Sequence, residues 1–348
     1  MTGRQAIDSG NWPMTEHERA SAFRERVSGT EVELGYAGIE TFYKAPHRAV
    51  ETLDDETDVA VLGVPYDGAA SNRPGARYGP RAIRRASGWW AYLSGYKGGL
   101  TNVDTREQVD LSTAELVDCG DVPVFPTDRE TTAESVTAHV ATAAERAVPI
   151  VLGGDHYVTY PAFRGVAEAL DADLGLVQID AHTDTVAESA VFGEHFHGSS
   201  TNLIATSEYG SYENVAQVGI RGYESPDFFE FADDVGLAVH PMAEVAERGI
   251  RPVVEEAIET AADGTDGVYV TFDIDGVDPA VAPGTGTPCP GGLSAREALT
   301  AMDVLGRHDA VVAADLMEVA PRYDPTNGTE RLASYLLVRF LEGLVGTA

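Results

Sequence analysis

The sequence predicts a three-layer α/β/α sandwich around a mostly parallel eight-stranded sheet. From residue 58 onward, short runs rich in valine, isoleucine and leucine alternate with longer stretches of helical periodicity. Such alternation is typical of a parallel sheet that helices cover on both faces. No repeat, low-complexity tract or linker interrupts it, and 43% of the residues are hydrophobic. We therefore expect a single α/β domain over residues 51–348, preceded by a polar N-terminal extension or arm over residues 1–50.

Strands are expected where a short apolar run is bounded by polar or turn-forming residues. Runs of this kind are Val59–Val64, Glu115–Val117, Pro149–Leu152, Leu174–Ile179, Val215–Ile220, Leu237–Val239, Val268–Phe272 and Val311–Leu316.

Helices are expected between these strands, where apolar residues recur at helical spacing and several segments open on a proline. A further short helix is expected near Glu16–Val27. The Trp-, Tyr- and Gly-rich stretch Gly88–Ser112 has no clear period, so we expect a long functional loop there. The predicted helices are Pro80–Ser87, Glu134–Arg146, Pro161–Leu170, Pro226–Asp233, Pro252–Ala262, Ala295–Leu305 and Glu330–Leu344.

The charge balance excludes some partners. The formal net charge is −32, and a field of that sign repels polyanions, so no nucleic-acid partner is expected. A surface rich in carboxylates and nearly free of lysine is typical of proteins from salt-loving organisms, because dense counterions screen the self-repulsion. We therefore expect a halophilic protein that requires molar salt.

The sequence also predicts where the protein works. No run approaches the ~20 apolar residues of a membrane helix, and the polar N-terminus lacks the apolar core of a signal peptide. The two cysteines lie far apart in sequence, and without a secretory context a disulfide is not expected. We expect a cytoplasmic protein with no membrane partner.

Acidic and imidazole side chains follow three of the expected strands. Asp180, His182 and Asp184 alternate after one strand, and Asp273 and Asp275 follow another. Alternate residues of an extended segment point the same way, so each set can face one point. So many carboxylates would repel one another unless cations lay among them. With His156, which follows a third strand, six ligands suit two bridged ions that activate a water, most plausibly Mn²⁺, with Fe, Co, Ni or Zn as alternatives.

Three motifs resemble those of a known family, the ureohydrolases, which include arginase and agmatinase. The resemblance extends from about residue 59 to the C-terminus, in the family's order and spacing. It implies an arginase-like fold and a binuclear Mn²⁺ centre, with Ni²⁺ or Co²⁺ as alternatives, which releases urea from a guanidino compound. The motifs are Gly153-Gly154-Asp155-His156, Asp180-Ala181-His182-Thr183-Asp184 and Asp273-Ile274-Asp275-Gly276-Val277-Asp278-Pro279.

The resemblance also implies a role for each ligand. Asp180 and Asp273 would bridge the two ions. The remaining ligands would complete the two sites, His156 and Asp184 in one and His182 and Asp275 in the other.

Other residues match family positions around the centre. Glu318 matches a glutamate that orients the planar guanidinium, and a carboxylate suits that cation as a bidentate partner. His197 matches a mobile proton-shuttling histidine, and we prefer it to His195 because the glycine that follows it also matches. Asp155 is expected to orient the site rather than bind an ion. Asn72 begins a loop that resembles one near the active-site mouth, although the arginines of that loop could equally be structural.

The expected partner is a small cationic guanidino substrate. The residues after Asp184 lack the pattern with which arginases read an α-amino acid, so the chain looks more like the agmatinase branch. Agmatine, hydrolysed to putrescine and urea, is the first expectation. Guanidinobutyrate, guanidinopropionate and free guanidine are alternatives. Aromatic side chains in Trp89–Tyr96 could stack on a guanidinium or form an oligomer contact.

Two rival functions are also consistent with parts of the sequence. A non-catalytic paralogue with a structural or regulatory role would keep the fold, but here every ligand, Glu318 and the histidine are present. A two-metal phosphoesterase would fit the ligands, but the sequence offers no clear basic phosphate clamp. By family resemblance, we expect a homo-oligomer, either a trimer or a hexamer.

Overall fold

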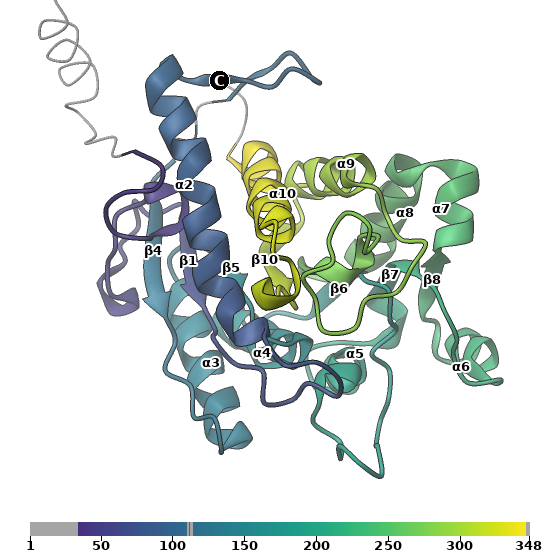
Figure 1. The fold of residues 1–348 in the computed structure, drawn as a ribbon. Helices are drawn as coiled ribbons and strands as arrows, with labels where there is room; N and C mark the ends of the chain where they lie inside the picture. The colour runs from purple at the N-terminus through teal and green to yellow at the C-terminus, as the bar shows by residue number, and fades with distance from the viewer. Residues whose placement is uncertain (1–33, 110, 112–113, 346–348) are drawn as a thin grey trace, which may run out of the picture.

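An eight-stranded parallel sheet forms the centre of the part of the chain that the computed structural model describes, residues 34–109, 111 and 114–345. Its strands follow the order β4-β1-β5-β10-β9-β6-β7-β8, and each neighbouring pair is parallel (Figure 1). The strands are β1 (Val59–Gly63), β4 (Leu116–Asp121), β5 (Val148–Leu152), β6 (Leu174–Ile179), β7 (Val215–Ile220), β8 (Ala238–Pro241), β9 (Gly267–Asp273) and β10 (Val311–Met317).

Helices cover both faces of this sheet, which confirms the predicted three-layer architecture. One apolar core lies between the sheet and α2 (Gly79–Lys97), α7 (Met242–Arg248), α8 (Ile250–Ala262), α9 (Ala295–Gly306) and α10 (Gly328–Leu344). The second lies between the opposite face and α3 (Arg129–Ala144), α4 (Thr159–Leu170), α5 (Ser200–Ala205) and α6 (Phe228–Val235). Within the described residues, no helix is long and apolar enough to cross a membrane.

The eight predicted strands are all present, with bounds that differ by a few residues at most. The central ones are buried along their whole length, because helices cover both of their faces. All seven predicted inter-strand helices are also present. The sequence interpretation missed α5 and α7, since six or seven residues are too few to show a helical period.

The prediction of a long loop over Gly88–Ser112 is wrong. Helix α2 continues to Lys97 and ends at Gly98, which adopts a left-handed φ of 71°. A small antiparallel hairpin follows, made of β2 (Leu100–Thr101) and β3 (Gln108–Val109). Gly88 lies inside this helix. A larger residue does not fit there, because an added Cβ would lie 2.6 Å from the Gly35 carbonyl oxygen. Tertiary packing thus outweighs the low helix propensity of glycine.

Aromatic packing explains how this helix continues past Gly88. The ring centroids of Trp90 and Tyr335 of α10 lie 4.5 Å apart, and the Trp90 indole N–H donates to Ser334 Oγ at 3.2 Å. On the outer side, Tyr92 and Tyr96 stack with centroids 5.9 Å apart, as expected for an i,i+4 pair. The aromatic residues therefore belong to a helix rather than to an irregular insertion.

Part of the predicted N-terminal arm packs against the domain. Phe42 is fully buried, and its backbone N–H donates to Asp118 Oδ2 at 2.6 Å. The same oxygen accepts from Arg84 Nε of α2 at 2.8 Å, in an ion pair that is itself buried. Asp118 of β4 therefore connects the arm, a helix and the edge of the sheet. The expected helix at Glu16–Val27 lies outside the described residues.

The register of the central strands places four strand ends at one level. Leu316 of β10 pairs with Leu152 of β5 on one side and with Phe272 of β9 on the other. Phe272 in turn pairs with Ile179 of β6. The residues that follow these positions consequently emerge side by side from one edge of the sheet, where open α/β sheets bind their ligands.

Candidate metal centre and active site

Six acidic and imidazole side chains converge above these four strand ends. All six were predicted from the sequence as metal ligands, and five of them form two groups that share Asp180. His156 follows β5, Asp273 ends β9, and Asp180 follows β6. The parallel sheet therefore brings together side chains that lie up to 119 positions apart, from His156 to Asp275.

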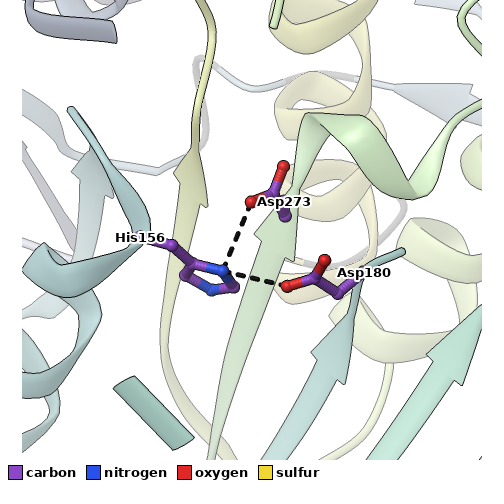
Figure 2. Close-up of side chains that lie close together, drawn as sticks. All are labelled: His156, Asp180 and Asp273. Atoms are coloured by element: carbon purple, nitrogen blue, oxygen red, sulfur yellow. Dashed lines mark ion pairs between the residues drawn. The ribbon is translucent and has the colours of Figure 1, made fainter. Parts of the chain in front are cut away.

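The first ligand group consists of His156, Asp180 and Asp273, all of them buried (Figure 2). His156 Nδ1 lies 3.0 Å from Asp180 Oδ2 and 3.3 Å from Asp273 Oδ2. Asp184 Oδ2 also lies 3.0 Å from this nitrogen. Three carboxylate oxygens thus surround one imidazole nitrogen.

The second ligand group consists of Asp180, His182 and Asp275. His182 Nδ1 lies 3.2 Å from Asp275 Oδ2 and 3.6 Å from Asp180 Oδ1. The Thr287 hydroxyl donates to Asp275 Oδ2 at 2.9 Å, which fixes that carboxylate from the other side. Asp180 is common to the two groups, whereas Asp273 belongs to the first, so a bridging position for Asp273 stays a prediction.

Local turns hold these carboxylates in place. Asp180 Oδ1 accepts a hydrogen bond of 2.7 Å from the His182 backbone N–H, and Asp273 Oδ1 accepts one of 2.8 Å from the Asp275 N–H. Aspartate side chains commonly accept a hydrogen bond from the backbone two residues further along the chain. Asp184 lies at a left-handed φ of 50°, which turns the chain back after the motif. The Asp-x-His and Asp-x-Asp spacings thereby orient successive ligands toward one point.

The electrostatics of the groups show strong mutual repulsion among the acids. Burial raises the pKa of Asp273 well above its usual range, and the charges of Asp275 and Asp180 raise it further. Burial and the charge of Asp180 likewise raise the pKa of Asp275. Burial also opposes ionisation of Asp180, but contacts with His156 and His182 outweigh it and lower the pKa of that carboxyl.

The histidines respond in the opposite sense. Burial disfavours a charged His182, yet the carboxylates of Asp180 and Asp275 outweigh this effect and raise its pKa to about 12. The pKa of His156 rises well above its usual range for the same reason. Protons on these rings are the only positive charges among the six side chains, so divalent cations would compete with protons for the cluster.

The donor set fits two metal ions. His156 Nδ1 is buried without a hydrogen bond of acceptable geometry, although three carboxylate oxygens lie 3.0–3.3 Å away. An imidazole nitrogen ringed by acceptor oxygens is an arrangement that a cation would satisfy. The first group with Asp184 would hold one ion and the second group the other.

Glu318 lies next to the first group, after the end of β10. It is 1% exposed and adopts a left-handed φ of 63°. Its Oε1 accepts a hydrogen bond of 3.0 Å from the His156 backbone N–H. Its own N–H donates to the Gly154 carbonyl at 2.8 Å. Hydrogen bonds to its backbone N–H and to its side chain therefore hold this unusual conformation and orient the carboxylate beside the ligand groups.

His197 pairs directly with this glutamate. His197 Nδ1 lies 2.8 Å from Glu318 Oε1, and its Nε2 lies 2.6 Å from Ser71 Oγ. Burial disfavours the charged imidazole, but the Glu318 carboxylate outweighs it and raises the pKa of His197 to about 9. The sequence interpretation missed Ser71. Its position next to Asn72, at the start of the loop assigned to the active-site mouth, was the available signal.

His195 occupies a different environment. Its ring meets Tyr157 edge-on with centroids 5.9 Å apart, and its Nδ1 lies 3.4 Å from the Tyr157 hydroxyl. It also lies near Tyr160, with centroids 6.5 Å apart. These aromatic contacts set His195 apart from Glu318, the residue that His197 contacts.

Asp155 supports the loop that leads to Ser71 and lies outside both ligand groups. It is fully buried, and its Oδ2 accepts a hydrogen bond of 2.7 Å from the Ala69 backbone N–H. Burial raises the pKa of Asp155 to about 8, the nearby charge of Glu318 raises it further, and His197 acts in the opposite direction.

Asn72 and Arg73 connect two loops at the rim. Asn72 Nδ2 donates to the Gly286 carbonyl at 3.1 Å, and Arg73 donates to the carbonyls of Gly286 and Thr285 at 3.2 and 2.8 Å. The Arg73 guanidinium also lies 4.3 Å from the centre of the Tyr323 ring. A side chain at Gly286 would come within 3.4 Å of Glu318 Oε2, so this junction lies beside the carboxylate.

Comparison with known proteins identifies the family of this arrangement. The model of the Arginase family matches residues 57–342, which include the five side chains of the ligand groups, Asp184 and Glu318. The mitochondrial agmatinase of Gallus gallus is 36% identical over 302 residues, covering 85% of this chain and 84% of the relative.

Two further relatives carry names other than agmatinase. Guanidinopropionase of Pseudomonas aeruginosa is 34% identical over 310 residues, covering 88% of this chain and 92% of the relative. The structure of proclavaminate amidinohydrolase from Streptomyces clavuligerus superposes with a TM-score of 0.78 at 34% identity, covering 90% of this chain and 99% of the other.

The two ligand groups predict different losses of metal from different variants. After reconstitution with Mn²⁺, the wild-type protein should retain two ions per chain. His182→Ala should retain one, because His182 belongs to the second group, and Asp180→Ala should retain neither, because Asp180 is shared. The measurement is the metal-to-protein ratio by mass spectrometry after gel filtration. His195→Ala is the matched control and should retain both ions. Equal retention in His182→Ala and the wild type would contradict the assignment.

Proposed function

The chain belongs to the arginase family, and within that family we propose that it hydrolyses a small cationic guanidino compound to urea and an amine, with agmatine as the preferred substrate. The observation that carries this proposal is the buried carboxylate of Glu318 beside the first ligand group. A guanidinium ion is a planar cation with paired N–H donors, and it matches an oriented carboxylate.

The two ligand groups would hold a pair of Mn²⁺ ions, with Ni²⁺ or Co²⁺ as alternatives. Carboxylate oxygens with some imidazole nitrogen suit these metals. When bound, such ions supply an activated water as nucleophile near neutral pH and stabilise developing negative charge. A strong nucleophile is required because a guanidinium is stabilised by resonance and is a poor electrophile.

Glu318 would position the substrate for this attack. Its Oε1 is already engaged by the His156 N–H and by His197, whereas its Oε2 faces the Gly286 junction. The substrate guanidinium would therefore meet a carboxylate whose orientation is set before binding, which lowers the entropic cost of reaching the reactive geometry.

His197 would hold the proton that the leaving amine requires. Its ring contacts Glu318 on one side and Ser71 on the other, so it lies where the guanidinium would be bound. Because its pKa is about 9, it carries a proton at neutral pH. An amine leaves far more readily after protonation, and a histidine close to the leaving nitrogen is a suitable general acid.

The charge of the chain supports agmatine among the guanidino compounds. With a net charge of −32, the protein attracts cationic substrates and repels anionic ones. Agmatine carries a second positive charge at its far end, whereas guanidinobutyrate and guanidinopropionate carry a carboxylate there. These two acids and free guanidine remain the alternatives, since relatives of similar identity are named agmatinase and guanidinopropionase.

We further propose that the enzyme is a homo-oligomer, a trimer or hexamer, that assembles in high salt. Exposed aromatic residues on α2 and the preceding segment support an interface, with Trp89, Tyr96 and Tyr36 exposed by 44%, 59% and 87%. Protomers of charge −32 repel one another unless counterions screen them.

Urea release from a panel of guanidino compounds tests the proposed reaction. Agmatine should give the highest kcat/KM, and Mn²⁺ and Ni²⁺ should be compared in parallel. Glu318→Gln should keep both metals but lose about ten- to a hundredfold in kcat/KM, because a charge-assisted contact contributes roughly 1.5–3 kcal/mol. Glu259→Gln, an exposed substitution on α8, is the control. Urea release from none of the compounds would refute the proposal, and full activity in Glu318→Gln would refute the role of that residue.

Replacing His197 should affect turnover more than substrate affinity. A proton donor acts on the reaction step, so His197→Ala should lower kcat by roughly 10²–10⁴ with a smaller change in KM. Steady-state kinetics with and without added imidazole measure this effect, and imidazole should restore part of the activity. His195→Ala is the matched control. If it gave the larger loss of kcat, the assignment of the shuttle would be reversed.

Dilution from molar to low salt should dissociate the oligomer before activity is lost. The Debye length grows from about 3 Å at 1 M to about 10 Å at 0.1 M, so repulsion between protomers increases as salt is removed. Light scattering and activity, followed on the same samples, measure the two steps. A monomer in molar salt, or an active oligomer in dilute buffer, would contradict this proposal.

A further inference from the structure

Three polar side chains form a buried chain behind His156, inside otherwise apolar strands. Thr271 of β9 and Asp315 of β10 are direct partners in the sheet register. His156 Nε2 lies 2.8 Å from Thr271 Oγ1, whose hydroxyl donates to Asp315 Oδ1 at 2.6 Å. The Tyr269 hydroxyl donates to Asp315 Oδ2 at 2.9 Å. All four residues are at most 1% exposed.

The direction of these hydrogen bonds assigns the proton on His156. A threonine hydroxyl has a single proton, and here it is directed to Asp315 Oδ1. With Asp315 ionised and taking that proton, Thr271 Oγ1 accepts at its contact with His156, so Nε2 of that ring carries the N–H. The Thr159 hydroxyl, 3.3 Å from Thr271 Oγ1, can donate to the same oxygen. The second oxygen of Asp315 accepts from Tyr269. When Asp315 is ionised, each of its two oxygens therefore accepts one hydrogen bond, and each proton in this chain of contacts is donated once.

The same assignment determines what His156 presents to the first ligand group. When the ring has no second proton on Nδ1, it is neutral, and the proton on Nε2 leaves the lone pair on Nδ1. Nδ1 is the atom that lies 3.0 Å from Asp180 and Asp184 and 3.3 Å from Asp273. The ring is thereby set to bind a cation with the nitrogen that faces the carboxylates.

We propose that Thr271 and Asp315 form a relay that fixes the tautomer and orientation of His156, which makes both of them positioning residues for the metal ion that His156 would hold. A metal-binding histidine commonly donates its other ring N–H to a carboxylate or carbonyl, which raises the basicity of the binding nitrogen. Here a threonine hydroxyl stands between the histidine and the carboxylate.

The cost of the relay supports a functional role. An ionised carboxylate in an apolar interior is strongly unfavourable unless it is fully hydrogen-bonded. The residues on either side of Asp315, Ala314 and Leu316, belong to the apolar core, so packing alone does not require an acid between them. His182 differs, because its side chain is 40% exposed and its ion pairs in the described chain are made by Nδ1. The relay therefore serves one of the two ligand groups.

The inference rests on the proposed metal centre, and a metal titration of the whole protein tests the two separately. Metal-free wild type, Thr271→Val and Thr271→Ser would be titrated with Mn²⁺ alone by calorimetry, with bound metal counted by mass spectrometry and folding checked by circular dichroism. Thr137→Val is the matched control, because it removes a buried hydroxyl that donates to the Pro161 carbonyl at 3.0 Å, away from the site.

Thr271→Val should bind one of its two ions about 10- to 100-fold more weakly than the wild type and the other with unchanged affinity. Thr271→Ser keeps the hydroxyl and should recover most of the lost affinity, while Thr137→Val should bind both ions normally. Asp315→Asn keeps an acceptor for Thr271 but loses the charge. It should show a smaller loss at the same ion, and it carries the test if Thr271→Val does not fold.

Several outcomes would overturn the relay. The first is wild-type affinity for both ions in Thr271→Val or, if that variant does not fold, in Asp315→Asn. The second is an equal loss of affinity at both ions. The third is a loss of affinity in Thr271→Ser as large as that in Thr271→Val. If the wild type binds two ions and the relay variants bind them with the same affinities, the relay fails but the proposed metal centre stands. If the wild type binds no Mn²⁺, the proposed metal centre fails and the relay with it.

Discussion

The constraint on which the rest of the structure depends is the repulsion among carboxylates buried at one edge of the sheet. Asp180, Asp273 and Asp275 are at most 3% exposed, and like charges at such distances interact strongly when water is excluded. Parallel strands with Leu152, Leu316, Phe272 and Ile179 in register bring these groups together at one edge of the sheet. Hydrogen bonds from the backbone and from Thr287 hold the acids in place, and bound cations would complete the balance of charge.

Glu318 extends the same constraint to the substrate. It adds another buried acid beside the cluster and adopts a left-handed backbone, a conformation that costs of order 1–3 kcal/mol for residues other than glycine. His197 lies beside its carboxylate and offsets its charge, and a bound guanidinium would offset it further. Glu318 would thus serve two cationic groups, the guanidinium and His197, and His197 would hold the proton that a leaving amine requires.

The sequence predicted the architecture well because it depends on local patterns, and local patterns also pointed to the acidic and imidazole side chains that the structure brings together. Strand β6 was predicted at its observed bounds, since an apolar run that contains one polar residue, Gln178, and is followed by Asp180 leaves few alternatives. The end of α2 was predicted wrongly, because the reason for Gly88 is a contact with Gly35, 53 positions away. Ser71 and the relay were missed for a related reason. Thr271 and Asp315 are single polar residues within apolar strands, and only the sheet register makes them neighbours. An acid inside a predicted buried strand was the available signal.

The candidate metal ligands and the rim around Glu318 lie on different parts of the fold. The ligands and the relay belong to strands or to the turns that end them, and their geometry is fixed by the packing of the sheet. The rim around Glu318 is made instead by loops, which Asn72 and Arg73 connect to Gly286 and Thr285 through carbonyl groups. Backbone contacts of this kind persist when neighbouring side chains change, and surface loops accept substitutions more readily than a buried sheet. Relatives with the same fold can therefore carry names as different as agmatinase, guanidinopropionase and proclavaminate amidinohydrolase at 34–36% identity. Every compound in the proposed panel would present the same guanidinium to Glu318, so selectivity among them would come from the groups at this rim rather than from the metal centre.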